Sequence, residues 1–176
     1  MSDRVEQLLD AAEARIRGSG FHAVSFRDLA DDLGIKSASV HYHYRRKEDL
    51  GAAVVERYQK RVFAMVEARI EAGDTPLAAY CATYRAALAE GDRVCLCGVM
   101  GAEMQGLPAP VQEVVRSFMR TNVEWLEGIY TQVGCDDPRA RALLTLAALQ
   151  GAMMLAVSLG DTTTFDRIAA QVACFK

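Results

Sequence analysis

Histidine is scarce in this sequence, and its distribution excludes a large class of enzymes. The 176 residues include three histidines, all before residue 44, so the rest of the chain has none for a catalytic triad. The five cysteines are odd in number, and their spacing fits neither a zinc site nor a disulfide framework, which indicates a reducing compartment. We therefore expect no enzyme, no cofactor and no metal, and keep an all-helical enzyme as a remote alternative.

Long apolar runs are missing as well. The first residues include Asp3, Arg4 and Glu6 instead of the apolar core of a signal peptide, and no uninterrupted apolar stretch is long enough to span a membrane. A cytoplasmic protein without a membrane partner is expected. The chain has 20 Lys and Arg against 23 Asp and Glu, so its overall charge provides no general attraction to phosphate.

Alternating strand patterns of useful length are also absent, and helix signals continue to the end of the chain. Thr75-Pro76, Gly134, Asp137-Pro138 and Gly160 are typical helix boundaries in the second half. The expected helices span residues 4–18, 25–33, 37–44, 47–72, 76–91, 93–105, 110–133, 138–160 and 164–175. The sequence therefore predicts an all-α fold of about nine helices.

The most informative segment runs from Ser25 to Leu50. Ser25 and Asp28 have the spacing of a capping box, and apolar residues follow on one face of a short helix. Gly34 suits the left-handed turn that ends this helix, and Ser37 is expected to cap the next one. Two short helices joined by a tight turn are predicted.

The second of these helices carries a local positive charge. From Gly34 through Lys47 the chain has four cations, Lys36, Arg45, Arg46 and Lys47, and no carboxylate. A patch of this kind suits a polyanion, and Lys47 at a helix start could meet a phosphate together with free backbone N–H groups. An ordinary solvated surface is the alternative on charge alone.

The order of residues decides between these interpretations. The runs Ser39-Val40-His41-Tyr42-His43-Tyr44 and Lys47-Glu48-Asp49-Leu50 resemble the helix-turn-helix of the TetR family of transcriptional regulators, with similarity over about residues 4–61. The resemblance implies a DNA-binding domain over 1–46, a connecting helix over 47–72, and a helical effector-binding and dimerisation domain over 73–176. It also implies a homodimeric, ligand-responsive repressor that binds a palindromic operator in double-stranded DNA and is released by a largely apolar small molecule.

The same resemblance indicates which residues would contact DNA. Arg27 matches a position that reaches a base edge, where arginine can bond to guanine O6 and N7. His41 departs from the tyrosine common in the family. His41 and His43 do not form a metal site, because residues two apart on a helix point about 200° apart. The full set of expected DNA contacts is Ser25, Arg27, Lys36, Ser37, Ala38, Ser39, His41, Tyr42, His43 and Lys47.

Two further sites follow from the resemblance, and ordinary core packing is the alternative for each of their residues. The expected lining of the effector pocket is Tyr80, Tyr84, Met100, Met104, Phe118, Trp125 and Gln150. The last two helices are expected to pair with those of a second copy through Leu143, Leu146, Ala147, Gln150, Met153, Met154, Phe165 and Ile168.

A thiol-based sensor is an alternative to a ligand pocket. Cys95 and Cys97 stand two apart, so they diverge on a helix and at most one would face a given cavity. Arg93 is close enough in sequence to favour a thiolate, which makes Cys95 the candidate redox or electrophile-sensing thiol. Small buried core residues are the other interpretation of both cysteines.

Overall fold

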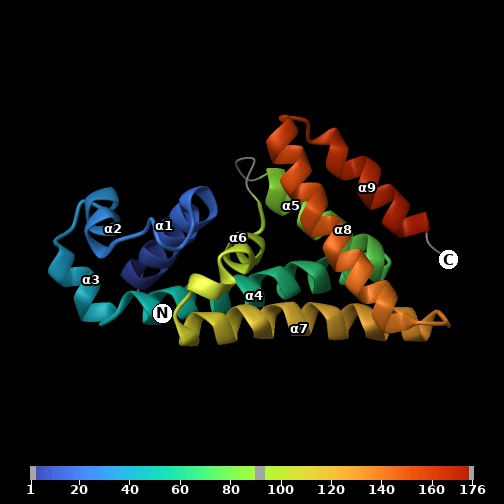
Figure 1. The fold of residues 1–176 in the computed structure, drawn as a ribbon, viewed down its shortest axis with the longest axis horizontal. Helices are drawn as coiled ribbons and strands as arrows, with labels where there is room; N and C mark the ends of the chain where they lie inside the picture. The colour runs from blue at the N-terminus through green and yellow to red at the C-terminus, as the bar shows by residue number, and fades with distance from the viewer. Residues whose placement is uncertain (1–2, 90–93, 175–176) are drawn as a thin grey trace. The chain divides into compact units, whose positions relative to one another are not determined.

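The computed structural model describes residues 3–89 and 94–174, and every regular element within them is helical, as the sequence predicts (Figure 1). These elements are α1 (Asp3–Ser19), α2 (Phe26–Asp32), α3 (Ser37–His43), α4 (Lys47–Glu71), α5 (Pro76–Ala89), α6 (Leu96–Ala102), the short 3₁₀ helix η1 (Met104–Gly106), α7 (Ala109–Gln132), α8 (Pro138–Leu159) and α9 (Thr163–Cys174). The described residues thus contain nine α-helices, the number expected.

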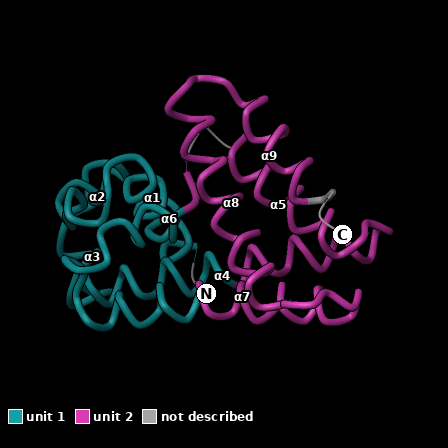
Figure 2. Tube along the Cα trace, turned by 45° about the vertical axis from the view of Figure 1, so that its right-hand side comes forward, with its two compact units in different colours: residues 1–59, 96–118 teal, residues 60–95, 119–176 magenta. Residues whose placement is uncertain are grey.

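The chain folds into two compact units (Figure 2). Unit 1 comprises residues 1–59 and 96–118, and unit 2 comprises residues 60–95 and 119–176. The first part of α4 and of α7 belongs to unit 1, and the remainder of each helix belongs to unit 2. Unit 1 therefore combines the predicted DNA-binding helices with α6, which is distant in sequence. The proposed boundaries at residues 46 and 72 stay a prediction.

Apolar packing in unit 1 fixes the three N-terminal helices. Leu8 of α1, Ala30 of α2 and Val40 of α3 form a buried cluster, and Phe26, Leu33 and Ile35 pack against it. Their burial removes apolar surface from water, the main favourable contribution to folding. Because Val40 points into this cluster, the opposite face of α3 is left toward solvent.

A charged network in unit 1 joins α1 to α4. The guanidinium of Arg57 lies 2.9 Å from Glu6, 2.7 Å from Asp10 and 3.3 Å from Glu13. Its side chain is mostly buried, so these carboxylates offset the cost of removing its charge from water. The network holds α1 in a defined position along α4.

In unit 2, α8 and α9 lie side by side, and both also contact α5 (Figure 1). The Asp137 carboxylate caps α8 by accepting a hydrogen bond of 2.9 Å from Ala140 N–H, and α8 ends at Gly160 with a φ of 63°. A hydrogen bond of 2.7 Å between Tyr130 and Thr145 links α7 to α8. The expected boundaries of α8 are confirmed.

Three local expectations are wrong. Lys36, not Ser37, occupies the N-cap of α3, and it makes no side-chain capping bond. The expected helix over 93–105 is reduced to α6 and η1, because the backbone leaves helical geometry at Glu103, where φ is −92° and ψ is 5°. Helix α7 begins at Ala109, before Pro110, since proline is tolerated in a first turn whose N–H groups have no intrahelical acceptor. The expected start at Arg93 lies outside the described residues.

The expectation about membrane-spanning length also needs correction. Among the described residues, α8 is one helix of 22 residues that is long and apolar enough to cross a membrane. The expectation concerned uninterrupted apolar stretches, and Thr145 and Gln150 interrupt the apolar run of α8. Several of its side chains, including Leu149 and Met153, are buried within the protein, as in the core helix of a globular domain.

Candidate nucleic-acid interface

The helix-turn-helix is built by local capping and by one buried contact. Ser25 Oγ accepts a hydrogen bond of 3.2 Å from Asp28 N–H at the start of α2, and the Ser25 hydroxyl donates to Asp28 Oδ2 at 2.6 Å. Gly34 turns the chain with a φ of +61°, which a residue with a side chain rarely adopts. Val40 then fixes the rotation of α3, because its side chain is fully buried.

The opposite face of α3 is open to solvent. Tyr42 is 85% exposed, a larger fraction than for any other large hydrophobic side chain in the described part of the chain. Tyrosine combines an apolar ring with a polar hydroxyl, a combination that is enriched in side chains that contact a partner. His41 is also exposed, although its ring contacts Phe26 edge-on with centroids 4.8 Å apart.

The other predicted DNA contacts divide by exposure. Ser37, His43 and Lys47 are partly buried, and the rest are exposed, namely Ser25, Arg27, Lys36, Ala38 and Ser39. Exposed small and basic side chains therefore lie on or next to α2 and α3, the helix that also carries Tyr42. Their contact with DNA stays a prediction.

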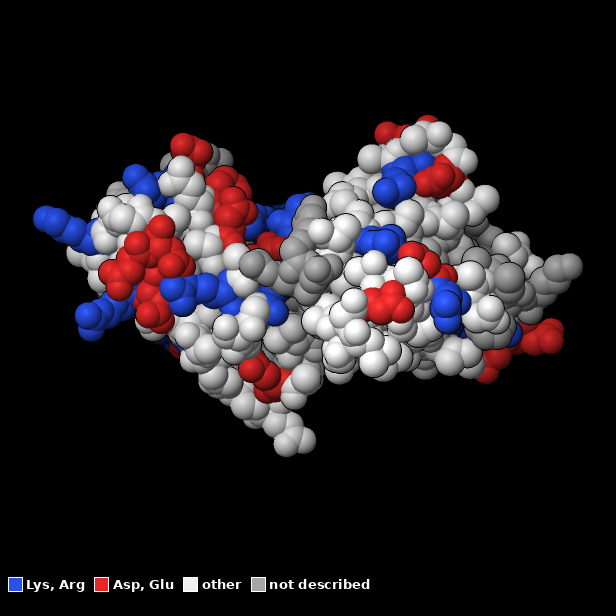
Figure 3. Space-filling model, turned by 90° about the horizontal axis from the view of Figure 1, so that it is seen from above, with Lys and Arg blue, Asp and Glu red and all other residues white. Residues whose placement is uncertain are grey.

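Local ion pairs reduce the positive patch predicted from the sequence. Arg46 lies 3.2 Å from Glu48 and 2.9 Å from Asp49, and its hydrogen bonds hold the pKa of Asp49 below the usual range. These carboxylates directly follow the segment counted in the sequence. Figure 3 shows Lys and Arg side chains projecting from the part of unit 1 that holds α2 and α3, beside a group of Asp and Glu. The exposed cations here include Arg27, Lys36 and Arg45.

Lys47 contacts the loop between α1 and α2. Its ammonium donates to the His22 carbonyl at 3.1 Å and lies 4.5 Å from the centroid of the Phe21 ring. Burial lowers the pKa of Lys47, while the charge of Glu103 opposes this shift. Any phosphate contact by Lys47 would therefore come from a side chain that already supports this loop.

Glu103 is a second support of the same loop, and sequence reasoning missed it. Its carboxylate accepts a hydrogen bond of 2.8 Å from the backbone N–H of Phe21, 82 residues earlier in the chain. The carboxylate fits against Gly20, where an added Cβ would lie 2.1 Å from Glu103 Oε1. Glu103 thus ties the segment after α6 to the loop that leads directly into Ser25 and Arg27. Only the folded structure brings these residues together.

The predicted pocket residues fall into two groups. In unit 2 the Tyr80 hydroxyl donates to Asn122 Oδ1 at 2.6 Å, and Gln150 Nε2 donates to Tyr84 Oη at 3.4 Å. Trp125 stacks on Tyr80 with ring centroids 5.3 Å apart. Burial raises the pKa of Tyr80, so its hydroxyl stays protonated. Asn122, which joins this cluster, was not predicted, and Gln150 Oε1 is buried without a hydrogen-bond partner.

The remaining predicted pocket residues belong to unit 1. Met100 and Phe118 are fully buried, Met104 is partly buried, and the Phe118 ring lies 5.8 Å from that of Tyr58. Three pockets on unit 2, two near the turn between α7 and α8 and one near the end of α8, are lined by other residues. A pocket formed by all seven predicted residues therefore stays a prediction.

The thiol alternative gains no support from the structure. Cys95 is 1% exposed and Cys97 is fully buried, so neither thiol is open to a reagent in solution. Burial raises the pKa of Cys81 to about 11, which keeps that thiol protonated. Arg93, which was expected to activate Cys95, lies outside the described residues.

The predicted dimer residues also divide by exposure. Leu143 and Met154 are 50% and 53% exposed, and Ala147 is exposed too. Gln150 and Ile168 are partly buried. The remaining three, Leu146, Met153 and Phe165, are buried within the protein. Leu144 and Leu155, which were not predicted, extend the exposed apolar face of α8.

Comparison with known sequences supports the helix-turn-helix assignment. Residues 8–54 match the family model described as bacterial regulatory proteins, tetR family. The chain is also similar to the HTH-type transcriptional repressor KstR2 of Mycolicibacterium smegmatis, with 28% identity over 76 residues. That alignment covers 43% of this chain and 37% of the relative, so the matched part spans well under half the length of the relative.

Solved structures extend the similarity over nearly the whole chain. A TetR transcriptional regulator from Legionella pneumophila has a TM-score of 0.88 and 29% identity, with 98% of this chain and 97% of that chain covered. A TetR-family regulator from Agrobacterium tumefaciens has a TM-score of 0.88 and 27% identity, with coverages of 96% and 94%. The fold and its relatives are those of transcriptional regulators and not of enzymes, and residues 8–54 carry the helix-turn-helix of the TetR family.

Proposed function

We propose that the protein is a homodimeric, ligand-responsive transcriptional regulator that represses by binding a palindromic operator in double-stranded DNA. The observation that carries this proposal is the exposed face of α3, where Tyr42 is 85% exposed while Val40, two residues earlier, is buried. Such a helix is fixed in rotation by its core contact and presents a side chain suited to base or phosphate contacts. A cytoplasmic location follows from this function.

In the complex we expect α3 to lie in the major groove. Arg27, exposed on α2, reaches a base edge, and Ala38 is small enough to approach a thymine methyl group. Lys36 and Tyr42 contribute phosphate and base contacts beside them. Ser25, Ser37, Ser39, His41, His43 and Lys47 complete the interface as sugar, phosphate or base contacts.

A single helix-turn-helix reads only a few base pairs, so a second copy is needed. The exposed apolar residues of α8 suit that role, because a contiguous apolar face on a soluble protein marks an interaction surface. We propose that Leu143, Ala147 and Met154, with Ile168 of α9, meet the same residues of a second copy around a twofold axis. The two recognition helices would then lie about 34 Å apart, one turn of DNA.

Release requires an effector that binds one spacing of the recognition helices better than the other. We propose that the effector is a largely apolar small molecule bound among the helices that follow α4. The thiol-sensing alternative lacks an accessible thiol at Cys95, and no observation favours an enzyme.

The test is operator binding by the full-length protein. Footprinting on DNA upstream of its own gene should reveal a protected palindrome, and fluorescence anisotropy should give an affinity that falls as salt rises. Lys36→Ala should weaken binding and lower the salt slope by about one, whereas Lys60→Ala removes the same charge from an exposed site on α4 and should change neither. Binding without sequence preference would overturn the proposal.

A further inference from the structure

A cavity in unit 2 lies apart from the predicted pocket residues. Its volume is about 520 Å³, within the range of small-molecule sites. Three segments form it: the start of α5, the end of α7 with the turn that follows, and the first turn of α8. We call it the α5–α7–α8 pocket, and it is lined by Thr75, Pro76, Leu77, Ile129, Tyr130, Val133, Gly134, Cys135 and Arg141.

Local sequence explains why this site is open. Helix α7 ends at Gln132, and Gly134 reverses the chain with a φ of +74°. Pro138 then restarts a helix, and Arg141 follows one turn later on α8. The turn leaves Val133 73% exposed at the edge of the cavity instead of packed in the core.

The walls of this pocket are mainly apolar. Pro76, Leu77, Ile129 and Val133 contribute hydrocarbon surface. Tyr130 is buried, and its hydroxyl is engaged with Thr145 at 2.7 Å, so the tyrosine is a fixed wall. These surfaces suit an apolar body and leave few places for a strongly polar one.

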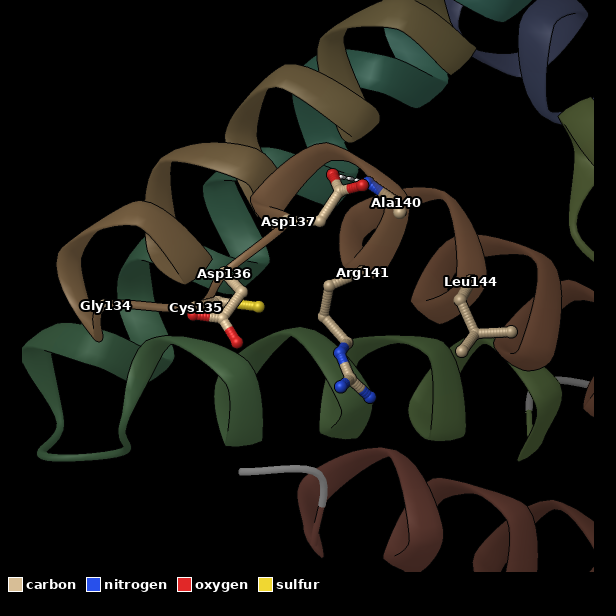
Figure 4. Close-up of a pocket in the computed structure, with 7 residues that line it drawn as sticks. All are labelled: Gly134, Cys135, Asp136, Asp137, Ala140, Arg141 and Leu144. Atoms are coloured by element: carbon tan, nitrogen blue, oxygen red, sulfur yellow. Dashed lines mark hydrogen bonds between the residues drawn. The ribbon is translucent and has the colours of Figure 1, made fainter.

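The charge on the lining of this pocket is positive. Arg141 is the only charged residue among the described residues that line the pocket. Arg141 also borders a neighbouring hollow of about 430 Å³, where Asp136 and Asp137 are found (Figure 4). The Asp137 carboxylate is directed to the Ala140 N–H as a helix cap, the bond drawn in Figure 4. Arginine carries five N–H donors in a planar fork that matches the geometry of a carboxylate.

We propose that the α5–α7–α8 pocket binds a compact amphiphilic monoanion, with its apolar body against Leu77, Ile129 and Val133 and its carboxylate on Arg141. A guanidinium binds a carboxylate in a bidentate, charge-assisted manner that a neutral hydroxyl does not reproduce. The ligand class is therefore a small carboxylic acid with an alkyl or aromatic body.

The pocket lies on the same two helices as the stacked rings of Tyr80 and Trp125 in unit 2. Pro76 precedes Tyr80 by one turn on α5, and Ile129 follows Trp125 by one turn on α7. Tyr80 and Trp125 stack on each other, so a ligand that displaces either helix end would act on this stack. Naming the bound anion as the effector rests on the proposed function, whereas binding itself does not.

Isothermal titration calorimetry of the full-length protein with octanoate and with octan-1-ol tests the proposal. The two probes have the same chain length and differ in charge. Octanoate should bind with about one site per chain and at least about tenfold more tightly than octan-1-ol, the size expected for a charge-assisted bond. Octanoate should also slow alkylation of Cys135, measured by peptide mass spectrometry.

Matched variants locate the binding. Val133→Glu adds a carboxylate at the exposed edge and should weaken octanoate binding about tenfold relative to Val133→Gln. Arg141→Gln should remove the preference for octanoate, whereas Arg139→Gln should keep it, because Arg139 is paired with Glu127 and does not line the pocket. Equal binding of both probes, or octanoate binding unchanged in Val133→Glu and Arg141→Gln, would overturn the inference.

Operator binding distinguishes this inference from the proposed function. Ligand-free wild-type protein should bind its operator whether or not octanoate binds the pocket. Loss of octanoate binding with intact operator binding would therefore overturn the pocket alone, and octanoate binding without operator recognition would overturn the proposed function alone.

Discussion

Substitution of Glu103 by alanine should loosen the loop that precedes the predicted DNA-binding residues. The wild-type carboxylate accepts the Phe21 N–H at 2.8 Å in a part-buried environment. Alanine leaves that N–H without this acceptor and removes a negative charge that favours the protonated form of Lys47. The loop over residues 20–22 should then become more mobile, and α2 should be less firmly placed.

The expected loss of unfolding free energy follows from the charged hydrogen bond between Glu103 and the Phe21 N–H. Hydrogen bonds to a charged group contribute about 1.5–3 kcal/mol, and a part-buried one should lie in the lower half of that range. We expect Glu103→Ala to lower the free energy of unfolding by about 2 kcal/mol. Glu103→Gln keeps an acceptor oxygen without the charge and should cost about 1 kcal/mol.

Urea unfolding and hydrogen exchange together measure this effect. Glu113→Ala is the control, because Glu113 is an exposed carboxylate on α7 whose contact with Arg116 is 3.8 Å long. Glu103→Ala should speed amide exchange in the peptide that contains Phe21 and weaken operator binding, while Glu113→Ala changes neither. Equal unfolding free energies and equal exchange for the two alanine variants would refute the reasoning.

Three other changes test separate parts of the structure. Gly20→Ala should destabilise the protein by about 1–3 kcal/mol in urea unfolding, because Gly20 has a φ of +84° and its new Cβ would clash with Glu103; unchanged stability would contradict this. Leu144→Glu on the exposed face of α8 should shift the light-scattering mass from dimer to monomer, and an unchanged dimer would exclude that face. Arg15→Gln should raise the pKa of Asp32 toward 3.8 in an NMR titration, because the hydrogen bond from Arg15 lowers that pKa in the wild type. The Arg15–Asp32 pair therefore stabilises the folded protein at neutral pH, and this stabilisation is lost as the pH falls through the lowered pKa of Asp32.

Features that depend on neighbouring residues were predictable from the sequence. The limits of α8 follow from Asp137 and Pro138 at one end and Gly160 at the other, since capping acts within a few residues. The turn at Gly34 is equally local.

Features that depend on distant residues were not predictable. The role of Glu103 could not be predicted, because its hydrogen bond joins it to Phe21, 82 residues earlier in the chain. Lys47 was assigned to phosphate without its contact to the His22 carbonyl. Met153 and Phe165 were predicted to lie in the dimer interface, but both side chains are buried inside the protein. The prediction failed because an apolar pattern along a helix does not distinguish an intramolecular core from a dimer surface.

The central claim is that the exposed face of α3 reads DNA, and Tyr42→Ala measured by operator titration tests it most directly. Because Tyr42 is 85% exposed, its removal should leave the urea midpoint within error of wild type while operator affinity falls at least about tenfold. Operator affinity equal to that of wild type, in a variant with unchanged stability, would contradict the account.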